Sequence, residues 1–185
     1  MKIAYWDCEA WDLSAEFAPL LCVSVLSLPD GEMVTFRQDE YIKRKKADGM
    51  ADDRALALDV RDYLKGFHLT GGWYSKGYDI QLVNTRLAKF GEELMKPVLH
   101  IDGTWYFRGW RGLKPKSSKL KHVAEFFDFE QKPEVPPDTW LNARSGQKAA
   151  MDVVVDRCEA DVRITRACIE KALDLGIIAN IQRYP

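Results

Sequence analysis

The sequence predicts an α/β domain whose mixed sheet is flanked by helices. Residues 19–28 form a near-continuous apolar run, which is typical of a central strand buried on both faces. Strand-like segments lie on either side of this run, at 2–8 and 33–36, and the turn Pro29-Asp30-Gly31 leads into the later one. Helix and strand patterns alternate after residue 54, so parallel strands should follow a three-strand meander.

Local patterns of residue type predict each element in turn. Residues 2–8 are rich in β-branched and aromatic side chains, whereas residues 37–54 are polar and carry charges of both signs, as expected of a surface loop. Apolar residues recur at helical spacing from Ala55 to Leu64. The remaining elements are predicted as a strand over 71–74, a helix from Asp79 to about residue 90, a strand over 97–102, a helix over 117–127, a loop over 128–147 and a last long helix over 147–175, with a break near Arg157.

The composition is that of a globular domain. The chain has 185 residues, of which 46% are hydrophobic and 30% charged, and we expect residues 1–185 to form a single domain. The formal net charge of −1 excludes a globally basic nucleic-acid coat but leaves room for a local basic patch. No apolar run reaches transmembrane length and the N-terminus has no signal-peptide pattern, so we expect a cytoplasmic protein with no membrane partner. The cysteines fit no common zinc spacing and are expected to be buried free thiols: Cys8, Cys22, Cys158 and Cys168.

Two carboxylates lie at the end of the first predicted strand. Asp7 and Glu9 are two positions apart, so on a strand they point to the same face. Like charges on a mostly apolar strand repel, and a divalent cation with oxygen ligands, typically Mg²⁺ or Mn²⁺, relieves that repulsion. The alternative is that the strand ends at Tyr5 and that water solvates both acids.

Two further acids occupy positions that need an explanation. Asp79 opens a helix after the Gly-containing loop 74–78, where it is either a functional carboxylate or a simple helix cap. Asp161 lies beside the apolar stripe of the last helix, where it either meets a partner or marks the boundary with solvent.

The order of these three features resembles the motifs of DnaQ-like, DEDD-type 3′–5′ exonucleases of the RNase H-like superfamily, nearest to the proofreading-type and YprB-like branches. That family has an Asp-x-Glu on its first strand, an aromatic-Asp pair opening a helix mid-chain, and an Asp in its final helix. Further matches are the segments His100-Ile101-Asp102 and Lys119–Phe127 and the residues Trp140 and Gly146 before the third motif. The resemblance covers about residues 2–173.

The resemblance implies an RNase H-like fold with a five-stranded mixed sheet, and a reaction supported by two divalent cations, Mg²⁺ or Mn²⁺. Asp7 would bind both ions, Glu9 and Asp161 the ion that activates the attacking water, and Asp79 would act largely through water. The implied activity is removal of nucleotides from the 3′ end of single-stranded DNA or RNA, with DNA favoured. No polymerase pattern accompanies the motifs, and the resemblance suggests a stand-alone enzyme of bacterial or phage origin.

The sequence departs from the family at the position of its usual general base. Arg157 stands where one branch has a catalytic tyrosine, and Asp156 stands where another has a histidine. An arginine stays protonated and cannot act as a base, so Arg157 is expected to stabilise negative charge on the reacting phosphate. The alternative is a surface arginine paired with Asp161 or Glu159.

A basic segment without acids is the candidate path for the strand. From Arg108 to His122 the chain carries six lysines and arginines and no acid, with Trp105, Tyr106, Phe107 and Trp110 before or within it, a mixture that suits single-stranded nucleic acid. The alternative is a solvated loop whose aromatic side chains enter the core. The residues expected to contact substrate are Trp11, Leu13, Ser75, Lys76, Trp110, Lys114, Lys116, Lys119 and Lys121.

A second functional hypothesis is a catalytically weak nucleic-acid-binding module on the same scaffold. The missing tyrosine or histidine favours it, whereas the retained carboxylates argue against it. The absence of a Gly-rich phosphate loop argues against a third hypothesis, a sugar or nucleotide kinase-like variant of the fold.

Overall fold

A six-stranded mixed sheet forms the centre of the protein. The computed structural model describes residues 1–41, 52–96, 98–108, 113, 115–179 and 182–184. The strand order is β3-β2-β1-β4-β5-β6. The strands are β1 (Ile3–Ala10), β2 (Leu20–Leu28), β3 (Met33–Arg37), β4 (Leu69–Gly72), β5 (Val98–Asp102) and β6 (Gln182–Tyr184).

The predicted five strands and their directions are confirmed. β1, β2 and β3 pair in antiparallel fashion, and β4 and β5 join β1 in parallel. β2 is buried along almost its whole length, as its apolar run predicted. The short strand β6 pairs antiparallel to β5 and was not predicted, because three residues are too few to show a periodic pattern.

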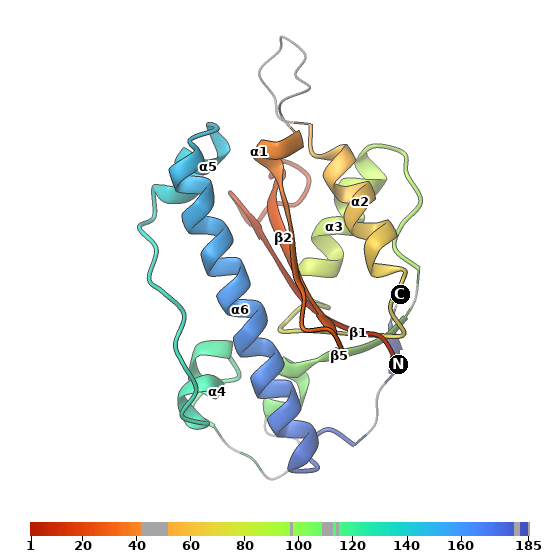
Figure 1. Cartoon of the computed structure of the whole chain (residues 1–185), viewed down its shortest axis with the longest axis vertical. Coiled ribbons are helices and arrows are strands. Elements are labelled where there is room, and N and C mark those ends of the chain that lie inside the picture. The colour runs from red at the N-terminus through yellow and green to blue at the C-terminus, as the bar shows by residue number, and fades with distance from the viewer. Residues whose placement is uncertain (42–51, 97, 109–112, 114, 180–181, 185) are drawn as a thin grey trace.

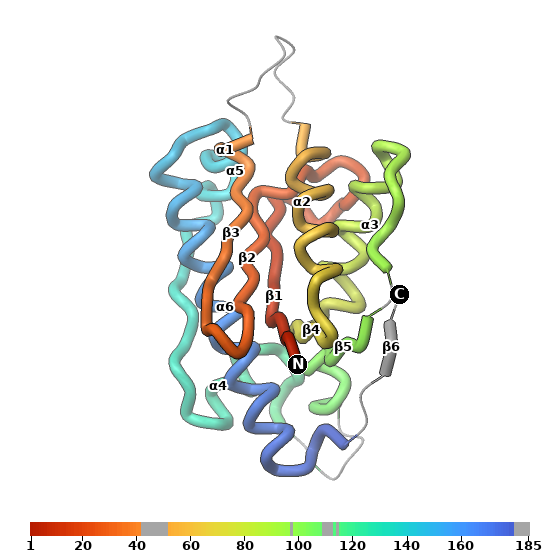
Figure 2. The backbone as a smooth tube through the Cα atoms, turned by 45° about the vertical axis from the view of Figure 1, so that its right-hand side comes forward, coloured from red at the N-terminus to blue at the C-terminus, as the bar shows by residue number. Residues whose placement is uncertain are grey.

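Helices cover both faces of the sheet (Figure 1). The 27-residue helix α6 (Lys148–Asp174) crosses one face, and α2 (Arg54–Leu64) and α3 (Asp79–Lys89) cover the other. The shorter helices are α1 (Gln38–Tyr41), the 3-10 helix η2 (Gly103–Phe107), α4 (Leu120–Phe126) and α5 (Thr139–Arg144). Figure 2 shows β3, β2 and β1 side by side, with α6 behind them and α2 beside them.

The alternation of side chains along β1 separates two cores. Trp6 and Cys8 pack with the residues of α2 and α3, whereas Tyr5 packs with the residues of α4 and α6. Asp7 and Glu9 share the pleat direction of Tyr5 and therefore face α6. This division decides which helix can supply a partner for the two acids.

Three predictions about loops and breaks were wrong. Residues 38–41 form α1 inside the predicted loop 37–54, and residues 139–144 form α5 inside the predicted loop 128–147. Each helix is too short for a helical period to stand out among polar residues. The last helix has no break near Arg157, because its apolar residues continue to face the sheet on both sides of that position.

The predicted burial of the cysteines is confirmed for all four thiols. Among the described residues, no helix has both the length and the apolar character that a membrane span requires.

A buried ion pair connects the loop after β1 to the helices on the α2 and α3 face. The Arg86 guanidinium bonds both carboxylate oxygens of Asp53, at 2.6–3.1 Å, and the two side chains are 4% and 0% exposed. Asp53 also accepts the Leu20 N–H, while Arg86 donates to the carbonyls of Ala15 and Glu16. The pair therefore holds the 11–18 loop, which follows the two strand carboxylates, against α3.

Replacing one member of this pair should be strongly destabilising. Arg86→Met should lower the free energy of unfolding by about 3–5 kcal/mol, because Asp53 would remain buried without its counter-charge. Denaturant unfolding measures the loss, and Arg163→Met, at an exposed arginine of α6, serves as the control. A loss below about 1 kcal/mol would place the pair in the class of surface ion pairs.

Candidate metal and active site

Asp7, Glu9 and Asp161 come together between β1 and α6. One carboxylate oxygen from each lies within 4.8 Å of the others. β1 continues to Ala10, so the alternative in which the strand ends at Tyr5 is wrong, and the two strand acids do share one face. The pairing of β1 with β2 shifts register directly after Glu9, an irregularity that is common beside active sites.

Asp161 is held in this cluster by the uninterrupted course of α6. α6 packs on β1 and β2, and the Cys158 thiol donates to the Asp7 carbonyl at 3.4 Å. Asp161 itself is 5% exposed. Its Oδ2 accepts a hydrogen bond from the Lys132 ammonium at 2.8 Å, while its Oδ1 is buried and has no hydrogen-bond partner. Asp161 is therefore not a solvated residue at the edge of the helix.

Asp79 lies next to the cluster, and its carboxylate is bonded to β1. Tyr78 is the N-cap residue of α3, and Asp79 is the first helical residue. Its Oδ1 accepts from the Cys8 backbone N–H at 3.1 Å and from the Cys8 thiol at 3.0 Å. The simple-cap alternative is thereby wrong, because this 2% exposed carboxylate ties α3 to β1.

Burial and mutual repulsion raise the pKa of Asp7, Glu9 and Asp79. Desolvation is the largest cause for Asp7, whose pKa lies well above its usual range, followed by the charges of Asp79, Asp161 and Glu9. Desolvation raises the pKa of Glu9, although the Trp140 hydrogen bond and the Arg157 charge oppose it. The pKa of Asp79 is raised to about 7 by desolvation, against the lowering effect of the Cys8 bonds. Such shifts are typical of sites that are completed by a cation.

The residues present fit divalent cations. The donor set consists of carboxylate oxygens, which are the preferred ligands of Mg²⁺ and Mn²⁺. The buried Oδ1 of Asp161 has no protein partner, and the raised pKa of Asp7 marks negative charge that the protein alone compensates poorly. A cation bound between Asp7, Glu9 and Asp161 would satisfy both conditions.

Arg157 contacts the cluster through Glu9. Its Nε lies 3.5 Å from Glu9 Oε1, one of its terminal nitrogens donates to the Pro133 carbonyl at 3.1 Å, and its guanidinium lies over the Trp140 ring. Trp140 Nε1 donates to the other Glu9 oxygen at 3.2 Å. The alternative of a surface arginine paired with Asp161 or Glu159 is wrong, because the pair is made with Glu9 and the side chain is 19% exposed.

Sequence reasoning missed Lys132. This residue belongs to the segment between α4 and α5, which contains several prolines and was expected only to be a loop. Its ammonium bonds Asp161 and lowers the pKa of both Asp7 and Glu9. No local pattern marks a single lysine in a polar segment, so only the path of the chain over α6 identifies it.

The loop before α3 corrects one expectation about substrate contacts. Ser75 is 0% exposed, and its hydroxyl is hydrogen-bonded to His100 Nε2 at 2.7 Å, so it does not present its side chain to a substrate. His100 Nδ1 is bonded in turn to the Thr70 hydroxyl. Lys76 is partly buried, and its backbone N–H donates to Asp102.

The other expected substrate contacts lie at the surface or outside the described residues. Leu13 is 81% exposed, whereas the Trp11 ring already has the Arg144 guanidinium 4.1 Å from its centre. Three lysines are exposed around the start of α4, at positions 116, 119 and 121. Trp110 and Lys114 lie outside the described residues.

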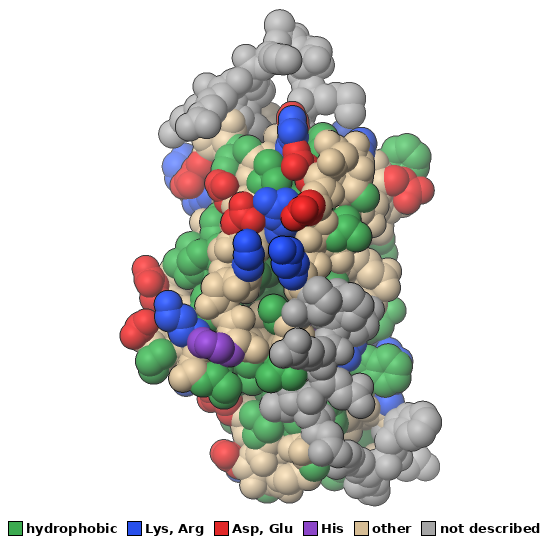
Figure 3. Space-filling model, turned by 90° about the vertical axis from the view of Figure 1, so that its right-hand side faces the viewer, with side chains coloured by type: hydrophobic (Ala, Val, Ile, Leu, Met, Phe, Trp, Pro, Cys, Tyr) green, Lys and Arg blue, Asp and Glu red, His purple; other side chains and the backbone are tan. Residues whose placement is uncertain are grey.

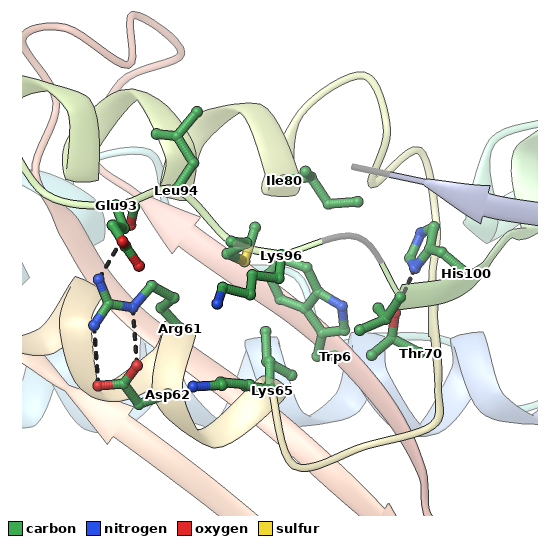
Figure 4. A pocket seen from close by; sticks show the side chains of 13 residues that line it. Trp6, Arg61, Asp62, Lys65, Thr70, Ile80, Glu93, Leu94, Lys96 and His100 are labelled. Atoms are coloured by element: carbon green, nitrogen blue, oxygen red, sulfur yellow. Dashed lines mark hydrogen bonds and ion pairs between the residues drawn. The ribbon is translucent and has the colours of Figure 1, made fainter.

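A pocket of about 90 Å³ lies on the opposite face of the sheet from the acidic cluster. It opens beside α2, with Trp6 and His100 among its lining residues, and Figure 3 shows basic side chains gathered on this side of the molecule between acidic ones. In Figure 4 the side chain of Lys96 extends toward Arg61 and that of Lys65 toward Asp62, to which Arg61 is bonded. None of the candidate carboxylates lines this pocket, so it is separate from the metal site.

Comparisons with known proteins point to one superfamily. A family model described as the RNase H superfamily matches residues 4–173. The structure is similar to that of the family B DNA polymerase from the hyperthermophilic archaeon Pyrobaculum calidifontis, with a TM-score of 0.73 and 18% sequence identity over 96% of this chain and 25% of the polymerase chain. The chain thus spans about a quarter of that polymerase's length. No curated protein matches the sequence.

The raised pKa of Asp79 predicts how the stability of the metal-free protein depends on pH. A carboxyl group whose pKa is about 7 when folded and 3.8 when unfolded favours the folded state fully below the lower value, and this contribution is lost as pH rises toward 7. In the presence of a chelator, the free energy of unfolding should therefore fall between about pH 4 and pH 7, by up to about 4 kcal/mol at about 1.36 kcal/mol per pKa unit.

Thermal unfolding across this pH range, with chelator, measures the effect. Asp79→Asn keeps an acceptor for Cys8 but removes the titration at residue 79, so its stability should fall less steeply. Added Mg²⁺ should restore stability at pH 8 in the wild type. A stability that stays level or rises between pH 4 and pH 7 would contradict the buried, mutually repelling cluster.

Proposed function

From the premise that this chain belongs to the RNase H superfamily, whose members generally hydrolyse phosphodiester bonds, we propose that it is a metal-dependent 3′–5′ exonuclease acting on single-stranded nucleic acid, with DNA favoured. The observation that carries this proposal is the group of three carboxylates from β1 and α6 within 4.8 Å, with Asp79 beside it. The structurally similar protein is a DNA polymerase, which supports nucleic acid as the substrate class.

Asp7, Glu9 and Asp161 would hold two divalent cations, with Asp79 acting from its position beside Cys8. When bound, such ions supply Lewis-acid stabilisation of the phosphate charge and lower the pKa of the attacking water. The protein contributes a fixed arrangement of ligands, because Asp7 and Glu9 belong to a central strand and Asp161 to a helix packed against it.

The cationic side chains around the cluster position Glu9 and Asp161. The Trp140 indole donates a hydrogen bond to one oxygen of Glu9 and the Arg157 guanidinium forms an ion pair with the other, so this carboxylate has little rotational freedom. Lys132 fixes Asp161 Oδ2 and leaves Oδ1 for a further partner. In this proposal Arg157 would also stabilise negative charge on a phosphate that reaches Glu9.

One observation favours the alternative of a catalytically weak nucleic-acid-binding module. Lys132 and Arg157 already provide two positive charges for the carboxylates of Asp161 and Glu9. A module that binds strands without cutting them could retain this internally compensated cluster. The cleavage assay below distinguishes the two functions.

Asp7→Asn should lower the rate of metal-dependent cleavage on the order of 10³-fold, because it removes a carboxylate of the cluster. The assay uses a 5′-labelled single strand with Mg²⁺ or Mn²⁺, and the same mixture with chelator. A ladder shortened by single nucleotides from the 3′ end is expected for the wild type. Asp174→Asn, at an exposed acid of the same long helix, should cleave normally.

Two results of that assay would count against the exonuclease. A strand that is retarded in a gel but stays intact with the wild type indicates the binding module. Wild-type cleavage that persists in Asp7→Asn would exclude the carboxylate cluster as the reaction centre.

Arg157→Ala should lower kcat by roughly 10²–10³-fold with a smaller effect on KM, because its charge matters most as negative charge develops on the phosphate. Arg157→Lys should recover part of kcat, since it keeps the charge but not the planar fork. Steady-state kinetics on a short strand measures both constants, with Arg163→Ala as the control. An effect confined to KM would assign Arg157 to substrate binding.

A further inference from the structure

Two exposed aromatic rings and an arginine form a cluster in the segments that follow β4 and β5. The Arg108 guanidinium lies 5.8 Å from the centre of the Tyr74 ring and 5.3 Å from the centre of the Trp105 ring. Tyr74 is 51% exposed and Trp105 is 52% exposed, and Arg108 is exposed as well. Aromatic rings of this size are usually buried, so two half-exposed rings around one cation indicate a surface for a ligand.

The protein holds Tyr74 in an uncommon conformation. Its φ is +60°, in the left-handed region that residues other than glycine rarely adopt. Its N–H donates to Asp102 at 3.0 Å, and its carbonyl accepts from the N–H groups of Gly77 and Tyr78. The ring lies against Gly77 so closely that a Cβ at that position would come within 2.5 Å of it. Each feature fixes the exposed ring in one place.

The Asp102 carboxylate also fixes the segment that carries Trp105. Asp102 accepts hydrogen bonds from the N–H groups of Tyr74, Lys76 and Thr104, all at 3.0 Å. It thus joins the loop after β4 to the 3-10 helix η2 that carries Trp105. The two rings belong to one rigid unit although they come from different segments of the chain.

The cluster lies at the same edge of the sheet as the acidic site. β1, β4 and β5 are adjacent and parallel, so their carboxyl ends meet at one edge, where ligands of such sheets bind. Asp7 and Glu9 lie toward that end of β1, Tyr74 follows β4, and Trp105 follows β5. With strands about 4.8 Å apart, β5 is roughly 10 Å from β1, which is a distance of one or two nucleotides along a strand.

Resting on the proposed function, we propose that Tyr74, Trp105 and Arg108 form a stacking platform for a base of single-stranded nucleic acid on the 5′ side of the scissile phosphate. The exposed ring surfaces supply a π-face that any base can stack on, and Arg108 supplies a cation for the adjacent phosphate. The platform tolerates every base, because it offers stacking and charge rather than a set of hydrogen bonds for one base edge.

The occupant follows from the combination of charge and position. A protein segment could also cover aromatic rings. Two features favour nucleic acid, whose phosphates are charged and whose bases are planar: the cluster lies at the same edge of the sheet as the candidate metal site, and a positive charge lies between its rings. The cluster serves DNA and RNA equally by this chemistry, and comparison of the two strands shows which one is preferred.

Binding in Ca²⁺ to short strands tests the platform without relying on cleavage. A 2-aminopurine base is placed at the first, second, third or fourth nucleotide from the 3′ end, and its fluorescence is quenched when it stacks. Quenching at one or more of the second to fourth positions is expected for the wild type and should be lost in Trp105→Ala. The dissociation constant should rise by about 5- to 150-fold in Trp105→Ala.

Two further variants separate stacking from charge. Tyr74→Asn removes the ring while keeping a residue that tolerates the left-handed backbone, and it should reduce the same quenching. Arg108→Gln should weaken binding and make the negative slope of log K against log salt shallower by about 0.7. Phe126→Ala removes an equally exposed ring (55%) on α4 and should change neither measurement.

The results distinguish failure of the platform from failure of the nuclease. If the wild type cleaves strands in Mg²⁺ while Trp105→Ala binds as tightly and quenches as strongly as the wild type, the platform is overturned and the nuclease stands. Quenching confined to the terminal nucleotide also overturns it. A wild type that neither binds nor cleaves strands overturns both proposals.

Discussion

Repulsion between carboxylates is the constraint on which this structure depends. Asp7, Glu9 and Asp161 approach within 4.8 Å in a partly dry space between a strand and a helix, where water screens their charges weakly. A fold gains nothing from such an arrangement by itself, since each group raises the free energy of its neighbours' ionised forms. The surrounding cations, Lys132 and Arg157, reduce this cost in the protein itself, and divalent ions would remove most of it.

The scaffold resists the repulsion because the acids lie on elements that are packed firmly, Asp7 and Glu9 on β1 and Asp161 on α6. β1 lies in the middle of the sheet and cannot shift without breaking pairs with both neighbours. α6 packs across that strand, and Asp79 joins α3 to β1 through Cys8 on the opposite pleat. β1 is thus held by helices on both of its faces, next to the two acids that repel each other.

The sequence was sufficient where a period or an ordered motif existed. The apolar run of β2, the helical spacing of α6 and the two-residue spacing of Asp7 and Glu9 predicted the sheet, the layers and the acidic cluster. Lys132 could not be predicted, because its place depends on the route of an irregular segment. Ser75 was misassigned since burial behind a loop leaves no local signal. The short helices α1 and α5 carry too few residues to show a period.

The acidic cluster also has a consequence for biosynthesis. Asp161 is synthesised long after Asp7, so the two carboxylates can meet only after all residues between β1 and α6 have been made. Contacts between such distant segments form late in folding, because the intervening chain must first be ordered. A chain that has not yet packed α6 on β1 therefore holds no assembled cluster, and any chemistry that depends on the cluster begins only after these two elements have joined.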